Sequence, residues 1–154
     1  IPLYVILADL GVINTRWALI LTYPTGMIPF ATWLLMGYYR AIPEELEHDA
    51  MVDGATRMQA FLRVTLPLAA PALLAVTLFA FTNAWKEFLF AFVFINSERL
   101  MTLPVGLAQT IFGDVYPWGM LMAASLLISI PVVIFYMYGQ KFMVAGLTAG
   151  SVKG

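Results

Sequence analysis

Three long uncharged runs alternate with shorter polar segments along the chain. Residues 17–39, 66–85 and 118–140 contain no Asp, Glu, Lys or Arg. A helix needs about 20 mainly apolar residues to cross the hydrocarbon core of a bilayer, so each run predicts one crossing. Residues 1–8 are apolar but too short to span. We expect them to be the outer end of a further helix whose earlier part precedes this sequence.

The predicted fold class is therefore an all-α membrane protein, a polytopic helical bundle with one partial and three full crossings. Pro24, Pro29 and Pro131 lie inside two of the runs and are expected to kink those helices, which membrane helices tolerate. Between the crossings, residues 9–16 predict a loop, and residues 96–117 predict an external loop or partial helix. A polar, glycine-bearing tail is expected from Lys141 onward.

Composition supports the membrane assignment. Of the 154 residues, 62% are hydrophobic and 11% charged, whereas soluble domains carry about a quarter charged residues. The formal net charge of −1 disfavours nucleic-acid binding, which needs a basic surface. With no cysteine and a single histidine, His48, the chain lacks the residues for disulfides or a typical Zn²⁺ centre.

The distribution of positive charge indicates the orientation. Residues 40–66 and the C-terminal segment fall on the same side of the predicted crossings. They hold five of the eight Lys and Arg residues: Arg40, Arg57, Arg63, Lys141 and Lys153. The positive-inside rule therefore places residues 40–66 and the C-terminus in the cytoplasm.

Residues 40–65 read as two short helices joined at Gly54, a residue that ends helices at low cost. Pro43 suits a first helical position, and Thr56 with Gln59 has the spacing of a capping box. Three glutamates favour the positive end of the first helix, and three apolar side chains recur at helical spacing in the second: Glu44, Glu45 and Glu47, then Met58, Phe61 and Leu62. The pair is either an ordinary solvated connector or a rigid element that transmits force from a cytoplasmic partner.

The residues themselves resemble a known family. The segment PEELEHDAMVDGA (43–55), followed by Phe61, Val64 and Leu66-Pro67-Leu68, resembles the EAA loop of binding-protein-dependent ABC permeases. The tail GLTAGSVKG (146–154), with Trp118-Gly119 and MAAS (122–125), resembles the carbohydrate permeases of the maltose and glycerol-phosphate type. The resemblance covers essentially the whole chain.

This resemblance implies a single, partial transmembrane domain (1–154) of a type I ABC importer in a bacterial or archaeal inner membrane. The family usually has six crossings, so about two and most of a third would be absent from this sequence. The implied partners are a dimer of ATPase subunits, a second homologous permease and an extracytoplasmic solute-binding protein. ATP–Mg would be bound by the ATPase, so no cofactor is expected in this chain. A sugar or oligosaccharide is the implied substrate, with a polyol or glycerol phosphate as alternatives.

The resemblance also implies that residues 40–66 are the loop that couples the permease to the ATPase, and that residues 146–154 reach toward the same interface. The candidate coupling residues are Glu47, His48, Asp49, Ala50, Asp53, Gly54 and Ala55. The motif's Glu falls at His48 and its first Ala at Asp49, while residues 53–55 match. Which of Glu47, His48 and Asp49 makes the polar contact with the ATPase stays open.

The candidate translocation path consists of Asn83, Trp85, Lys86, Glu87 and Ser125. Intramembrane charges often line a transport route, and Asn83 and Glu87 would share a helix face at i,i+4. The alternative places Lys86 in the outer headgroup layer, because a helix from Leu66 reaches about 30 Å there. For Ser125, as for Ser129, Thr77 and Thr82, the alternative to a sugar contact is hydrogen bonding between helices.

Two other classes of function fit less well. The chain contains no Walker phosphate-binding motif, catalytic triad or paired carboxylates of a hydrolase. For an intramembrane enzyme the best pair would be Lys86 and Glu87, which point about 100° apart if they are neighbours on a helix. A structural or receptor membrane protein would leave the helical pair at 40–65 unexplained.

Overall fold

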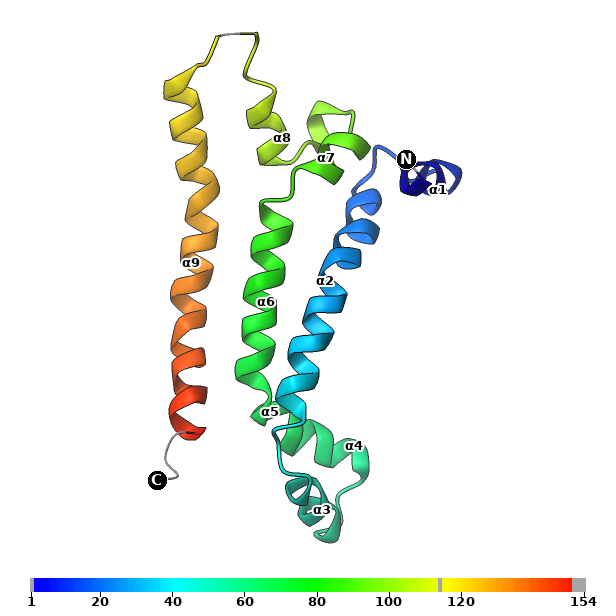
Figure 1. Cartoon of the computed structure of the whole chain (residues 1–154), viewed down its shortest axis with the longest axis vertical. Helices are drawn as coiled ribbons and strands as arrows, with labels where there is room; N and C mark the ends of the chain where they lie inside the picture. Colours follow the sequence, from blue (N-terminus) through cyan, green and yellow to red (C-terminus); the bar gives the residue numbers. More distant parts are fainter. Residues whose placement is uncertain (1, 114, 151–154) are drawn as a thin grey trace. The chain divides into compact units, whose positions relative to one another are not determined.

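The protein is described here by a computed structural model that covers residues 2–113 and 115–150, with side chains as far as residue 140. The ribbon is almost entirely helical (Figure 1). In chain order the elements are α1 (Pro2–Asp9), α2 (Arg16–Tyr39), α3 (Glu45–Val52), α4 (Arg57–Ala60), the π-helix η1 (Phe61–Thr65), α5 (Leu66–Leu68), α6 (Ala70–Trp85), α7 (Leu89–Phe94), the 3₁₀-helix η2 (Glu98–Leu100), α8 (Leu103–Ala108) and α9 (Trp118–Gly150). The predicted all-α class is confirmed.

Two of the three predicted crossings are single helices. Helix α2 and the segment Trp118–Gln140 of α9 are each long and apolar enough to span a membrane. Both helices continue past their internal prolines without a break. Helix α9 also continues to Gly150, whereas the sequence predicted a tail from Lys141. The end of that predicted tail, residues 151–154, lies outside the described residues.

The middle crossing differs from its prediction. The segments Arg57–Leu68 and Ala70–Trp85 meet at an angle of 68°, so the straight helix begins at Ala70 and not at Leu66. Pro67 and Pro71 flank the bend, and neither has the N–H that an unbroken helix would need. With 16 residues, α6 is about 24 Å long, which is shorter than the hydrocarbon core.

The chain divides into two compact units, each of which draws on α2, α6 and α9. The first unit comprises residues 1–28 and 81–134, and the second comprises residues 29–80 and 135–154. In the first unit a small core forms around Leu7, Ala18 and Phe94. It joins α1 and the start of α2 to α7.

Asn14 ties together two loops of the first unit. Its Oδ1 accepts the N–H groups of Asn96 (3.0 Å) and Ser97 (2.9 Å), and its own N–H donates to the carbonyl of Phe94 (2.8 Å). Its φ of 57° lies in the left-handed region, which Asn tolerates better than most residues. The loop before α2 is thereby held to the loop after α7.

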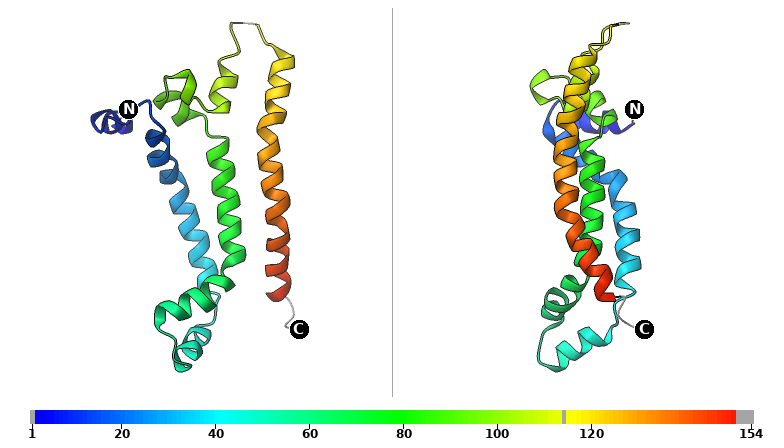
Figure 2. Two further views of the ribbon diagram at one scale, coloured as in Figure 1. Left: turned by 180° about the vertical axis from the view of Figure 1, so that it is seen from behind. Right: turned by 90° about the vertical axis from the view of Figure 1, so that its left-hand side faces the viewer.

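In the second unit, α6 packs against both α2 and α9 (Figure 2). The rings of Phe79 and Phe30 lie 4.2 Å apart between centroids. On the other side Leu78 approaches Gly139 so closely that a Cβ at Gly139 would lie 2.9 Å from Leu78 Cδ1. Small residues allow such close approach between membrane helices, where packing replaces the hydrophobic effect.

Most large apolar side chains remain on the surface of the chain. Trp33, for example, is 70% exposed, and Leu126 and Met137 are similarly open. In water this would be unfavourable, but lipid tails and neighbouring membrane helices provide an apolar surrounding. The exposed surface therefore agrees with a chain that spans a membrane.

Candidate functional site

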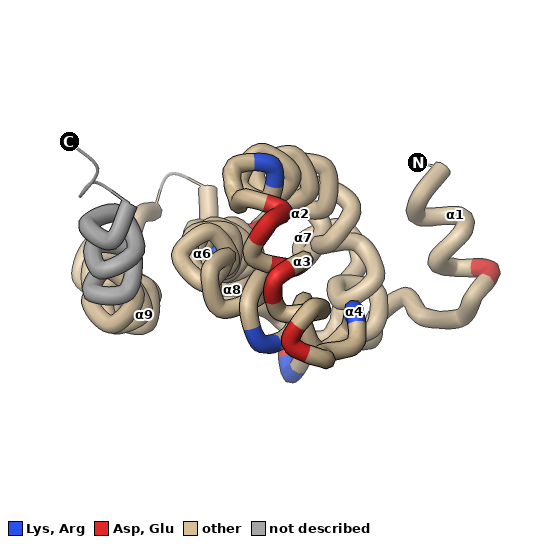
Figure 3. Tube along the Cα trace, turned by 90° about the horizontal axis from the view of Figure 1, so that it is seen from below, with Lys and Arg blue, Asp and Glu red and all other residues tan. Residues whose placement is uncertain are grey.

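The helices α3 and α4 lie beyond the end of α2 and beside α5 (Figure 1). They belong to the second unit, and most of the acidic residues of that unit lie along α3 (Figure 3). Glu45 and Glu47 occupy the first turn of α3, where carboxylates interact favourably with the helix dipole. The pair α3–α4 is thus the most polar part of a mainly apolar unit.

The turn after α3 is closed by Gly54. Its φ is 92°, and its N–H donates to the carbonyl of Met51 (3.1 Å). The N–H of Ala55 donates to the carbonyl of Ala50 (3.0 Å). These two bonds form a Schellman motif, which satisfies the last carbonyls of the helix. The prediction that Gly54 ends the first helix is confirmed.

The start of α4 is closed by a capping box. Thr56 Oγ1 accepts the N–H of Gln59 (3.4 Å), and Gln59 Oε1 accepts the N–H of Thr56 (3.0 Å). This confirms the predicted box at these two residues. Because the turn between α3 and α4 is hydrogen-bonded from both sides, the two helices are held at a defined angle.

Two details of the predicted pair are wrong. The first helix begins at Glu45 and not at Pro43, because Pro43 heads a turn in which its carbonyl accepts the N–H of Leu46 (3.3 Å). The second helix does not keep α-helical spacing, because α4 gives way to the π-helix η1 at Phe61. Met58 (66% exposed) and Leu62 (50% exposed) stay on the surface, while Phe61 stacks against Tyr39.

The candidate coupling residues do not share one environment. Four of them are exposed, namely His48, Asp49, Asp53 and Gly54, and two are half-buried, namely Ala50 and Ala55. Glu47 is also half-buried, and its Oε1 accepts a hydrogen bond from the hydroxyl of Thr65. Two shallow depressions flank α3, one including Asp53, Gly54 and Arg63, the other including Glu44, His48 and Arg57. The part these residues play in coupling remains a prediction.

The candidate path residues are separated by a break in the helix. Helix α6 ends at Trp85, so Glu87 does not share a helix face with Asn83 as predicted. Glu87 instead caps α7: its Oε1 accepts the N–H of Phe90 (2.8 Å) and its Oε2 that of Ala91 (3.1 Å). A carboxylate that satisfies free N–H groups at a helix start is more stable than one left in an apolar environment.

Trp85 and Tyr23 complete this cluster in the first unit. The indole Nε1 of Trp85 donates to the carbonyl of Ile128 on α9 (2.9 Å), and its ring stacks on Phe81. The buried hydroxyl of Tyr23, from α2, lies near the carboxylate of Glu87 without reaching good hydrogen-bonding geometry. Sequence reasoning missed Tyr23, because a tyrosine in an apolar run carries no signal of a partner more than 60 residues away.

Three of the four hydroxyl groups considered for a sugar contact or for bonding between helices bond within their own helices. Ser125 donates to the carbonyl of Leu121 (2.7 Å) and Ser129 to that of Ser125 (2.8 Å). Thr77 does the same with Leu73 (2.7 Å). Each bond joins a side chain to the carbonyl four residues earlier, which is the usual alternative for a hydroxyl inside a helix.

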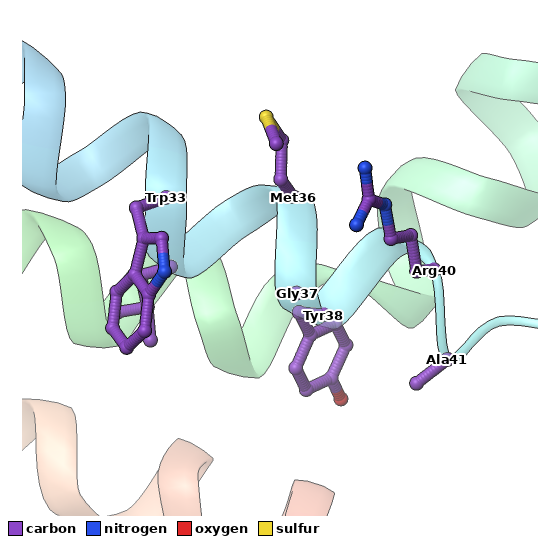
Figure 4. Close-up of a pocket in the computed structure, with 7 residues that line it drawn as sticks. Trp33, Met36, Gly37, Tyr38, Arg40 and Ala41 are labelled. Carbon is purple, nitrogen blue, oxygen red and sulfur yellow. The ribbon is translucent and has the colours of Figure 1, made fainter.

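A further pocket lies along the last turns of α2 and reaches the start of the candidate coupling segment (40–66). It is lined by Trp33, Leu34, Met36, Gly37, Tyr38, Arg40 and Ala41. Figure 4 shows Trp33 and Tyr38 on one side of the helix, with Met36 and Arg40 on the other. Aromatic rings beside an arginine at a helix end are typical of the membrane–water interface. Among the residues with described side chains, no group of three His, Asp or Glu is placed to hold a metal ion.

Comparison with known proteins identifies the family. Residues 1–148 match the family described as the binding-protein-dependent transport system inner membrane component. The chain belongs to this family. It is thus part of an inner membrane component of a transport system, and the resemblance noted in residues 43–55 and in the C-terminal tail is confirmed at the level of the family.

Individual relatives support this family assignment. The chain is 42% identical to the trehalose/maltose transport system permease protein MalG of Thermococcus litoralis, over 99% of this chain and 55% of that protein. It is 46% identical to the diacetylchitobiose uptake system permease protein DasC of Streptomyces coelicolor, over 100% of this chain and 56% of that protein. The chain spans about half the length of these curated relatives.

A solved structure supports the fold. A chain of a bacterial ABC transporter involved in the import of the acidic polysaccharide alginate superposes with a TM-score of 0.67 at 27% identity. The match covers 92% of this chain and 55% of that one. The fold is therefore that of an ABC importer permease.

Proposed function

We propose that this chain belongs to the membrane-spanning subunit of an ATP-driven, binding-protein-dependent importer for a sugar or oligosaccharide. The observation that carries the proposal is the α3–α4 pair. Its turn is hydrogen-bonded from both sides, and it exposes His48, Asp49 and Asp53 next to Gly54. Such a pair can pass the movement of a docked protein to the membrane helices without bending.

In this mechanism the energy for transport comes from ATP hydrolysis by partner subunits. Two ATPase subunits bind ATP–Mg and push on the coupling segment (40–66), which faces the cytoplasm in the orientation favoured by its arginines. A second, homologous permease subunit encloses the path together with this one. The pair alternates between outward-open and inward-open states, and an extracytoplasmic binding protein delivers the substrate.

The relatives support the proposed substrate class. Their names refer to trehalose, maltose and diacetylchitobiose, and that of the solved transporter refers to alginate, all of which are carbohydrates. Asn83, Trp85, Lys86, Glu87 and Ser125 remain the candidate path residues. The aromatic face of Trp85 offers a surface on which a sugar ring could stack, although its N–H is held by α9.

The test uses the full-length permease with its second permease, ATPase and binding protein, reconstituted in proteoliposomes. We expect the ATPase to co-purify, the loaded binding protein to stimulate ATP hydrolysis, and labelled disaccharide to enter only with ATP. Competition by disaccharides, polyols and glycerol phosphate then separates the substrate classes. Uptake that proceeds without ATP, or the failure of any ATPase to bind, would contradict the proposal.

A further inference from the structure

The junction between the coupling segment and α6 contains a hydrogen bond between two side chains. Thr65, the last residue of η1, donates its hydroxyl to the Glu47 carboxylate of α3, 18 residues earlier. Thr65 is 7% exposed, whereas nearby Leu62 and Leu68 are 50% and 44% exposed. The bond therefore connects α3 directly to the base of α6.

The π-helix is what directs Thr65 toward α3. In η1 the N–H of Leu66 bonds to the carbonyl of Phe61, five residues earlier. A turn with one extra residue rotates whatever follows by about 100° relative to a continuous α-helix. In a regular α-helix the hydroxyl of Thr65 would point elsewhere, and Glu47 would lose its donor.

The backbone of Thr65 holds the other side of the same junction. Its carbonyl accepts the N–H of Ala69 (2.9 Å), which is fully buried at the 68° bend into α6. One residue thus contacts α3 through its side chain and the bend through its backbone. A displacement of α3 must move Thr65, and through it the start of α6, or break the bond to Glu47.

From this geometry we infer that Glu47 and Thr65 form an internal latch that makes α3 and the base of α6 move together. The inference rests on the proposed function for its consequence in transport. It assigns Glu47 a positioning role within the chain. The polar contact with the ATPase is then left to the exposed His48 and Asp49.

The functional test compares sugar molecules imported per ATP hydrolysed in the reconstituted full complex. We expect Thr65→Val and Glu47→Leu each to lower this ratio about tenfold while the ATPase still co-purifies, because a hydrogen bond to a charged group shifts a two-state equilibrium by roughly that factor. The double variant should be no worse than either single variant, since both remove one bond. Thr65→Ser keeps the hydroxyl and should restore coupling.

Two controls isolate the latch. Glu45→Gln removes a charge from the same turn of α3, and Thr25→Val removes a hydroxyl that bonds within its own helix, α2. Both should leave the ratio unchanged. A normal ratio in Thr65→Val, additive losses in the double variant, or loss of ATPase binding in Glu47→Leu but not in Thr65→Val would overturn the latch.

A measurement independent of transport separates this inference from the proposed function. Spin labels at Glu45→Cys on α3 and Leu68→Cys on α5, both exposed, report the distance across the junction. We expect a narrow distribution in the parent and in Thr65→Ser, and a broad one in Thr65→Val. An unchanged distribution in Thr65→Val would reject the latch, whereas failure of the parent to bind any ATPase would reject the proposed function alone.

Discussion

Gly54 is the residue on which the shape of the coupling segment most directly depends. At a φ of 92° an added Cβ meets no neighbour, so the cost of a side chain there is conformational and not steric. We expect Gly54→Ala to destabilise the turn by about 1 kcal/mol. Gly54→Pro also removes the N–H that bonds to Met51 and should abolish ATPase docking while membrane insertion stays normal.

Co-purification of the ATPase with the variant permease measures this effect. Gly26→Ala is the matched control, because Gly26 lies inside α2 with ordinary helical geometry and open space around it. It should bind the ATPase like the parent. Normal ATPase binding by Gly54→Pro would show that the geometry of this turn is not needed for docking.

Asn14 provides a second test at the scale of one residue, in the first unit. Asn14→Gly accepts the positive φ but loses both hydrogen bonds to the loop after α7, and should cost about 2 kcal/mol. Asn14→Asp keeps an acceptor at the same place and should be nearly neutral. Thermal unfolding of the purified permease checks both. Equal stability of the two variants would mean that the side-chain bonds contribute little.

At the scale of elements, the packing of α6 against α9 depends on Gly139. A methyl group there would meet Leu78 at 2.9 Å, and Leu78 is itself buried. Gly139→Ala should be tolerated with a small shift of the leucine, whereas Gly139→Val should cost about 1–3 kcal/mol by overpacking. Thermal unfolding in detergent is the measurement, with Gly119→Ala, where nothing lies within 4 Å, as the control.

Several of these elements could be predicted from the sequence, and others could not. Helices α2 and α9 were predictable because a run of about 20 uncharged residues has few other stable structures in a membrane. Gly54 and the capping box at Thr56 were predictable because their chemistry is local. The break after Trp85 was not, because it depends on whether the Glu87 carboxylate finds N–H donors in the next helix.

Features that depend on distant contacts were also out of reach. The π-helix η1 inserts one residue into a turn, and nothing in FLRVT (61–65) distinguishes it from an α-helix. The bond between Thr65 and Glu47 follows from that insertion and joins two different elements. The candidate coupling segment could therefore be located from its sequence. The hydrogen bond that Glu47 makes inside the segment could not be predicted in this way.

At the scale of the whole molecule, the mechanism requires the coupling segment to lie on the cytoplasmic side. The 154 residues contain no cysteine, so single cysteines can be introduced for labelling. Asp49→Cys on α3 and Ser97→Cys in the loop after α7 lie on opposite sides of the predicted crossings. In intact cells a membrane-impermeant maleimide should label Ser97→Cys only, and after permeabilisation it should label both.

The topology test also distinguishes the proposed importer from a chain inserted the other way. Charge favours the cytoplasmic side for residues 40–66 together with the C-terminal segment, because five of the eight Lys and Arg residues fall on that side: Arg40, Arg57, Arg63, Lys141 and Lys153. An ATPase that hydrolyses cytoplasmic ATP can reach α3 only in that orientation. Labelling of Asp49→Cys in intact cells, with the parent unlabelled, would place the helical pair outside and remove the basis for ATP-driven coupling.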